Sequence, residues 1–209
     1  MPAPFPADQI GSLLRPQYLL DAQNAVLQFG MHNTYQPNAD PALITAAHDA
    51  EAQAITAVVQ HQLTQNVAPI TTGEFARASF VSGFFETLAG ITIRHTAFAD
   101  AFRTDFPIAR PYLRRGFEGR DLPIATAKVR WERSAYMDEW VRLRALVGEE
   151  RWGMCKMTVP SPAWTALQVR VGRAWEEGVY VGETAEEEYC GDCGEAVRRE
   201  ILALYEAGW

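Results

Sequence analysis

The sequence predicts an α/β protein built from βαβ units, and three observations support this fold class. Short apolar segments typical of buried strands alternate with longer segments in which apolar residues recur at helical spacing. The 209 residues contain no internal repeat, low-complexity segment or change of composition, so we expect a single domain over 1–209. The chain is 48% apolar and 22% charged, an ordinary composition for a protein that buries a core.

The first third of the chain predicts one strand and two helices. The strand at 8–14 is followed by a helix over about 16–29. Asp40 and Pro41 are residue types preferred at a helix N-cap and first turn. The apolar spacing that follows them extends this second helix to about Gln65.

The middle of the chain departs from simple alternation. A second strand is predicted at 67–72, after which 91–94 and 125–131 alternate apolar and polar residues. We expect these two segments to pair as an antiparallel hairpin outside the parallel units, with 103–123 as its loop. A helix over about 135–147 follows.

The last part of the chain predicts a third buried strand at 154–159 and a C-terminal helix. This helix is expected to begin at a capping box formed by Thr184 and Glu187 and to end at Ala207-Gly208. Its predicted apolar stripe comprises Cys190, Cys193, Val197, Ile201 and Leu204. The whole pattern therefore predicts about three βα units and one β-hairpin excursion.

Charge and composition exclude several classes of partner. The formal charge of −7 argues against nucleic acid, which needs a basic face. No apolar run approaches the roughly 20 residues that cross a bilayer, and the opening residues do not have the pattern of a secretory signal. Three cysteines do not form a disulfide framework in a chain of this length, so we expect a reducing, cytoplasmic location.

Polar side chains gather where the predicted strands end, which is where α/β proteins place their working residues. Glu74 is the candidate catalytic residue, and its carboxylate suits the ammonium of a small zwitterionic ligand. Arg15 or Arg77 would then face the ligand carboxylate. In the alternative interpretation, the two arginines pair with loop carboxylates and Glu74 caps a helix. The other candidate contacts to the small molecule are Ser12, Thr158, Ser161 and Trp164.

The cysteines and histidines predict no metal site built by this chain alone. Cys190 and Cys193 form a CxxC motif, but no second pair lies at the spacing of a four-ligand zinc site. Both lie on the apolar stripe of the last helix, and Cys155 lies in a predicted strand, so packing is the favoured interpretation. The four histidines are scattered.

Four motifs, in this order, resemble the catalytic barrel of cobalamin-independent methionine synthase, and more closely its single-barrel relatives in bacteria and fungi. The motifs are Phe5-Pro-Ala-Asp-Gln-Ile-Gly-Ser-Leu-Leu-Arg-Pro16, Ile70-Thr-Thr-Gly-Glu-Phe-Ala-Arg77, Lys156-Met-Thr-Val-Pro-Ser-Pro162 and Ile201-Leu-Ala-Leu-Tyr-Glu-Ala-Gly208. The resemblance implies a TIM-type (β/α)₈ barrel of the superfamily shared with uroporphyrinogen decarboxylase. It also implies that the residues matching Ser12 and Glu74 help to hold an amino-acid substrate.

Three positions depart from the family pattern. Relatives usually have Asp where this chain has Thr72, His where it has Gln9, and a second Arg where it has Ala76. Each change removes a charge or a proton-transfer group. The resemblance therefore implies that methyl transfer is lost or repurposed, to lyase, cyclase or isomerase chemistry in a secondary pathway.

The largest departure is length. The family's zinc ligands, which activate the homocysteine thiol for methyl transfer from methyltetrahydrofolate, come from a second half that this chain lacks. We therefore expect an incomplete TIM-type barrel, with no cofactor in this chain alone and zinc only if a partner supplies its ligands. Open strand edges are an aggregation liability, so we expect a homodimer or heteromer to complete the barrel. Two alternatives stay open, a catalytically inactive half-barrel that is a binding or regulatory subunit of a full-length relative, and a truncated product without its own function.

Overall fold

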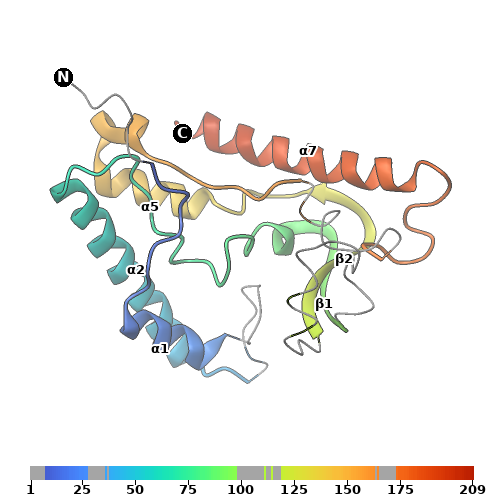
Figure 1. The fold of residues 1–209 in the computed structure, drawn as a ribbon, viewed down its shortest axis with the longest axis horizontal. Helices are drawn as coiled ribbons and strands as arrows, with labels where there is room; N and C mark the ends of the chain where they lie inside the picture. Colours follow the sequence, from blue (N-terminus) through green and yellow to red (C-terminus); the bar gives the residue numbers. More distant parts are fainter. Residues whose placement is uncertain are drawn as a thin grey trace.

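The structure, a computed structural model, describes residues 8–27, 36, 38–97, 111, 114, 119–162, 164 and 173–209. Its regular elements, in chain order, are α1 (Gln17–Val26), α2 (Pro41–Thr64), the short 3₁₀ helix η1 (Phe85–Thr87), β1 (Leu88–Ala97), β2 (Gly119–Trp131), α5 (Met137–Val147), the 3₁₀ helix η2 (Glu149–Met154) and α7 (Ala185–Glu206). Figure 1 shows α7 above the end of β2, against which it packs, and α1 and α2 together lower in the view, with α2 also contacting α5.

The predicted hairpin excursion is confirmed. Strands β1 and β2 pair antiparallel, with Ile91 opposite Ala125 and Leu88 opposite Trp131. The register shifts at Gly90, whose φ is +81° and whose missing side chain lets the carbonyl of Lys128 approach. The expected loop end at 123 is wrong, because β2 already begins at Gly119.

The three predicted parallel strands are not regular strands in the structure. In the described residues the only multi-residue sheet is the two-stranded hairpin, and Ile70 and Cys155 form one isolated parallel bridge. Two hydrogen bonds hold this bridge, from the Ile70 amide to Met154 O and from the Lys156 amide to Ile70 O, both 2.8 Å. The 8–14 segment makes a single backbone–backbone hydrogen bond to them, from the Leu13 amide to Gly73 O at 3.1 Å.

These three segments therefore run side by side as extended chain without a full ladder. Pro69 and Pro160 have no amide hydrogen to donate, and η2 ends only at Met154, inside the predicted third strand. The fold is mixed α/β, and the barrel expected from the sequence is a proposal that the described elements do not by themselves establish.

The helices follow the prediction more closely. Asp40 accepts a hydrogen bond from the Ala42 amide at 2.8 Å, as an N-cap should, and α2 runs on to Thr64. Helix α5 matches the predicted 135–147 range. The expected end of the first helix near Phe29 lies outside the described residues.

The last helix begins where the sequence predicts, at Ala185 after the N-cap Thr184, but the predicted capping box needs a correction. Thr184 has φ −93° and ψ 3° instead of the extended N-cap geometry, and its hydroxyl donates to Glu188 at 3.0 Å. The capping box with Glu187 is therefore wrong. The buried face also differs, because Ile201 is 38% exposed whereas Glu200 is fully buried.

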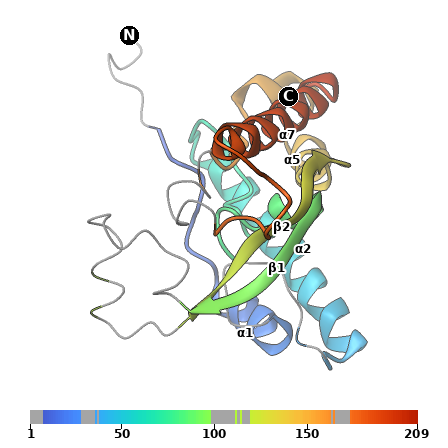
Figure 2. The ribbon, with the colours of Figure 1, turned by 90° about the vertical axis from the view of Figure 1, so that its right-hand side faces the viewer.

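The core joins α2, α5 and α7 to the hairpin. Figure 2 shows the hairpin running diagonally, and α7 packs against β2. The largest buried aromatic side chains are Trp140, Tyr189, Phe75, Phe84 and Phe85, each at most 1% exposed. Among the described helices, none combines the length and apolarity that crossing a bilayer requires.

Candidate functional site

The site begins with an unusual turn at Gly73 and Glu74. Both residues lie in the left-handed region, with φ of +70° and +57°. This conformation is costly for a residue with a side chain and persists only where neighbouring contacts hold it. Here the Thr71 hydroxyl accepts from the Gly73 amide at 3.0 Å, and the Thr72 hydroxyl accepts from the Glu74 amide at 3.2 Å.

The turn places the Glu74 carboxylate between the first and third extended segments. Thr158 Oγ1 donates to Oε1 at 2.5 Å, and Ser12 Oγ donates to Oε2. Glu74 is 4% exposed, whereas Ser12 is exposed. Access to the carboxylate is therefore from the Ser12 side.

Gly11 lets these groups approach one another. A Cβ at this position would lie 2.7 Å from Glu74 Oε1 and 2.7 Å from the methyl carbon of Thr158. Such distances do not occur between real side chains, so residue 11 must be glycine for the carboxylate to keep this position.

Arg77 is buried beside the carboxylate, at 1% exposure. Its Nε donates to Glu139 Oε2 at 2.9 Å, and its Nη1 donates to both the carbonyl and the hydroxyl of Thr158 at 3.0 Å. Nη2 lies 2.9 Å from the same Glu139 oxygen but outside hydrogen-bond geometry. The guanidinium also lies over the Tyr136 ring, 4.0 Å from its centroid. Burial lowers the pKa of Arg77, but the attraction of Glu139 and other neighbours outweighs burial, so this pKa is raised.

Arg15 is only half-buried and has a different set of partners. Its Nη2 donates to two carbonyls of the turn, Glu74 O at 3.0 Å and Arg77 O at 2.5 Å. Its Nε is buried and has no hydrogen-bond partner among the described residues. Burial lowers the pKa of Arg15, and Glu74 partly offsets this effect. Arg15 is thus the site cation whose guanidinium is not held by a carboxylate hydrogen bond.

The structure therefore brings together Ser12, Arg15, Glu74, Arg77 and Thr158, as the sequence predicts. The sequence left open whether each arginine faces a ligand carboxylate or pairs with a loop carboxylate. Arg77 pairs with a carboxylate of the chain, but this carboxylate, Glu139, belongs to helix α5 and not to a loop. The remaining two candidates lie farther along the third segment. Ser161 is exposed, and Trp164 packs edge-on against Phe80 with ring centroids 4.8 Å apart.

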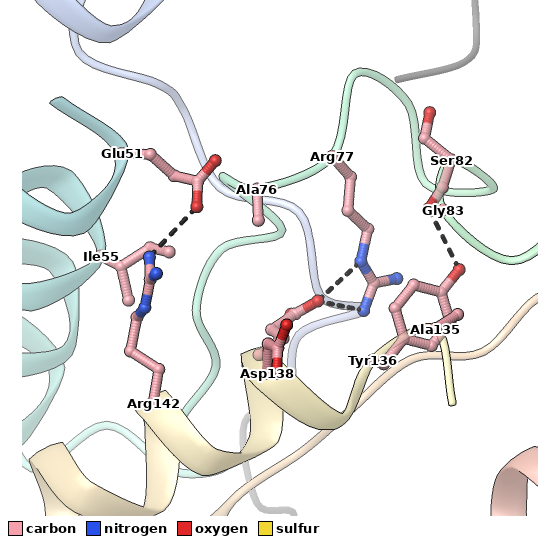
Figure 3. Close-up of a pocket in the computed structure, with 11 residues that line it drawn as sticks. Glu51, Ile55, Ala76, Arg77, Ser82, Gly83, Ala135, Tyr136, Asp138 and Arg142 are labelled. Carbon is pink, nitrogen blue, oxygen red and sulfur yellow. Dashed lines mark hydrogen bonds and ion pairs between the residues drawn. The ribbon is translucent and has the colours of Figure 1, made fainter. Parts of the chain in front are cut away.

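Sequence reasoning missed Glu139 and Tyr136. Glu139 is 9% exposed and accepts from the Thr72 hydroxyl at 2.5 Å in addition to its pair with Arg77. In the sequence it is an acid in the first turn of a helix, where acids are common because they favour the helix dipole. Only the tertiary packing, which places α5 against the turn at Gly73 and Glu74, distinguishes Glu139 from such an acid. A small cavity of about 110 Å³ lies beside this pair, and Ala76, Tyr136 and Glu51 line it (Figure 3).

The other two departures from the family pattern also have defined surroundings. The Gln9 amide donates to Gln62 Oε1 at 2.9 Å and to Pro69 O at 2.6 Å. Gln62 in turn donates to Thr71 O at 2.8 Å. Gln9 thus ties the first extended segment to α2 and to the second segment. Ala76 presents only a methyl group to the small cavity.

The cysteines have the surroundings of packing residues. Burial raises the pKa of the Cys193 thiol to about 12 and that of Cys155 to about 11, and it also raises the pKa of Cys190. In the part of the chain that the structure describes, no three His, Cys, Asp or Glu side chains gather closely enough to hold a metal ion. These donors do not fit a zinc ion.

Comparison with solved structures shows which known folds this chain resembles. The described fold is similar to about half of each of two solved structures of the vitamin-B12-independent methionine synthase type. The first is a Listeria monocytogenes protein named for that enzyme, with a TM-score of 0.63 and 24% identity, covering 99% of this chain and 50% of that one. The second is a Shewanella sp. W3-18-1 B12-independent methionine synthase solved with selenomethionine, with a TM-score of 0.58 and 18% identity, covering 95% and 47%.

One curated relative matches in sequence. The uncharacterised protein YxjH of Bacillus subtilis (strain 168) is 26% identical over 206 residues, which are 99% of this chain and 46% of YxjH. No protein-family model matches the chain. The chain thus spans about half the length of the relatives it matches.

Proposed function

We propose that this chain is a methionine-synthase-like partial barrel that binds a small, amino-acid-like ligand at Glu74. The observation that carries this proposal is the Glu74 carboxylate, buried at 4% exposure and held by the hydroxyls of Ser12 and Thr158. A buried carboxylate in a strained turn is typical of a functional site. The likeness to half of the methionine-synthase-type structures supports it at the level of fold.

The chemistry of the site favours a zwitterion. Each Glu74 oxygen accepts one hydroxyl, and a carboxylate has about four acceptor positions, so both oxygens keep capacity for an ammonium group. Arg15 keeps donors that no carboxylate uses and is the candidate contact for the ligand carboxylate. Arg77 is occupied by Glu139 and Thr158, so its role is to position Glu74 and the third segment.

The catalytic proposal needs further polypeptide. We propose that a partner chain or second copy completes the barrel, and that zinc, if the reaction uses it, is held by residues of that partner. Gln9 and Thr72 stand where relatives have a proton-transfer group and a charge. We therefore propose repurposed chemistry of the lyase, cyclase or isomerase type instead of methyl transfer. The same two residues favour the second candidate function, a catalytically inactive binding subunit.

Isothermal titration calorimetry of Glu74→Gln tests the ligand proposal. The probes are L-methionine and its analogue without the amine, 4-(methylthio)butanoate. The wild-type chain should bind L-methionine at least tenfold more tightly than the analogue, and Glu74→Gln should lose this preference, because a charged hydrogen bond contributes about 1.5–3 kcal/mol. The matched control is Glu195→Gln, an exposed glutamate of α7, which should bind as wild type does. Equal affinity of Glu74→Gln and wild type for L-methionine would contradict the role of Glu74.

A further inference from the structure

The cavity of about 110 Å³ beside Arg77 is bounded by α2, α5 and the residues that follow the turn at Glu74. Figure 3 shows Glu51 and Arg142 on one side of Ala76 and Arg77 on the other. A water molecule takes up about 30 Å³ in the liquid, so the cavity has room for several non-hydrogen atoms. Its size limits an occupant to a small molecule.

The wall formed by Arg77 presents a buried donor that makes no hydrogen bond. Among the described residues, Arg77 Nη2 has no hydrogen-bond partner, although Glu139 Oε2 lies 2.9 Å away. That oxygen already accepts from Nε of the same guanidinium. Buried polar groups in folded proteins almost always have a hydrogen-bond partner, so an exception indicates a ligand or an ordered water beside it. Arg77 Nη2 therefore favours an acceptor in the cavity.

The opposite wall presents a carboxylate that is only partly neutralised. Among the described residues, the Glu51 carboxylate has one hydrogen-bond donor, Arg142 Nη1 at 3.1 Å. Burial raises the pKa of Glu51, and the attraction of Arg142 and His48 offsets only part of this effect. A second cavity of about 150 Å³, between α1 and α2, is also lined by Glu51 and Ala76. Glu51 thus borders open space on two sides and can accept from a further donor.

The charges around the first cavity favour an occupant with a positive group. Among the described residues that line it, Glu51, Asp138 and Glu139 are carboxylates, and Arg77 and Arg142 are guanidinium groups. With all five groups ionised, the carboxylates are in excess by one. A simple cation would leave Arg77 Nη2 without an acceptor, and a simple anion would add to the excess negative charge. A molecule with both an ammonium and a carboxylate group satisfies both walls.

We propose that this cavity binds a small zwitterion of the size of glycine, with its carboxylate at Arg77 Nη2 and its ammonium group at Glu51. The inference goes beyond the ligand proposed at Glu74 and does not depend on it, because neither Glu74 nor Ser12 lines the cavity. The bound zwitterion completes the hydrogen bonds of Arg77 and joins this arginine to α2.

Saturation-transfer difference NMR with glycine tests the site in the full-length chain. Wild type should bind glycine saturably. Acetate and methylammonium, which each carry one of the two charges, should bind at least about tenfold more weakly. Glu51→Gln keeps the side-chain shape but removes the partner of the ammonium group, so it should weaken glycine binding by about tenfold or more. The matched control is Asp49→Asn, at an exposed position of the same helix, which should bind glycine as wild type does.

Two further measurements separate this cavity from the Glu74 site. Ala76→Leu, which fills the cavity without changing its charge, should abolish glycine binding. Excess L-methionine, whose side chain is too large for the cavity, should not displace glycine. No saturable binding by wild type, unchanged binding by Glu51→Gln, or displacement of glycine by L-methionine would overturn the proposal. Circular dichroism checks the fold of each variant, and Glu51→Gln decides the result if Ala76→Leu lowers the melting temperature.

Discussion

At the scale of single residues, the candidate site depends on close approach and on buried charge. The hydroxyls of Ser12 and Thr158 and the absence of a side chain at Gly11 set the position of the Glu74 carboxylate. Behind it, the pair of Arg77 and Glu139 is removed from water. Substitutions at Gly11 and Arg77 should therefore have larger effects on stability than substitutions at exposed residues.

Gly11→Ala should displace Glu74, because the new methyl group would overlap both the carboxylate and Thr158. We expect about 1–3 kcal/mol less free energy of unfolding, the cost of overpacking, and weaker binding of L-methionine. Urea denaturation and calorimetry measure the two effects. Gly194→Ala, in α7 with nothing within 4 Å, is the control and should stabilise the chain by about 0.5–1 kcal/mol. Unchanged stability of Gly11→Ala would argue against the contact.

Arg77→Met should lower the free energy of unfolding by about 3–5 kcal/mol, because it leaves the Glu139 carboxylate buried without its partner. Adding Glu139→Gln should cost less than the sum of the two single changes. A double-mutant cycle by urea denaturation measures this coupling. The exposed pair of Lys128 and Glu188, whose side chains are 50% and 47% exposed, is the control, and its coupling should stay below about 1 kcal/mol. Additive effects at Arg77 and Glu139 would contradict the pairing.

The sequence predicted which side chains lie close together where they stand near the ends of extended segments. Ser12, Glu74 and Thr158 follow or end predicted strands, and the structure brings them together. Glu139 could not be found this way, because nothing local distinguishes it from an acid that favours a helix dipole. Its partner Arg77 is distant in sequence and reaches it only in the folded chain.

At the scale of elements, α7 is held by a buried carboxylate as well as by apolar contacts. Glu200 is fully buried and accepts four hydrogen bonds, from Trp131 Nε1, Ser134 Oγ and the amides of Ala135 and Tyr136. Trp131 is the last residue of β2, and the other three donors belong to the connection between β2 and α5. Glu200 thus joins three elements, which explains why a charged residue lies on the helix face that the apolar pattern assigned to Ile201.

Glu200→Gln should therefore destabilise the chain although it keeps the side-chain shape. The new amide group would face an N–H or O–H donor and leave a buried donor unsatisfied, at a cost of about 1–3 kcal/mol. Thermal and urea unfolding followed by circular dichroism measure the change. Glu206→Gln, at an exposed position of the same helix, is the control and should unfold as wild type does. A Glu200→Gln variant as stable as that control would show that the four bonds contribute nothing.

At the scale of the whole molecule, the chain spans about half the length of the relatives it matches. The hairpin and the helices bury a common core, but the three extended segments share only one isolated bridge, between Ile70 and Cys155, and leave Ile10 and Leu14 exposed. Parallel strands are normally covered on both faces and paired on both sides. The exposed Ile10 and Leu14 side chains are therefore apolar surface that the described residues do not cover.

The isolated chain should accordingly bind the dye 8-anilinonaphthalene-1-sulfonate, because exposed apolar surface enhances its fluorescence. Ile10→Asp/Leu14→Asp should reduce this fluorescence by about half, whereas Val181→Asp, at an exposed residue before α7, should change it little. Fluorescence titration at matched protein concentration measures the effect. Wild-type fluorescence no greater than that of the dye in buffer would contradict an exposed apolar surface at Ile10 and Leu14.

The amino-acid sequence by itself determined the positions of α2, α5 and α7 closely, the existence of the hairpin, and the residues grouped at Glu74. These features follow from local signals, namely apolar periodicity, an N-cap at Asp40 and the ends of apolar segments. Only the tertiary structure decided that the predicted parallel strands are bridged extended segments, that Thr184 is no capping-box residue, and that Glu139 and Glu200 are buried acceptors. Strand pairing and buried polar contacts join residues far apart in the chain, and no local pattern encodes them.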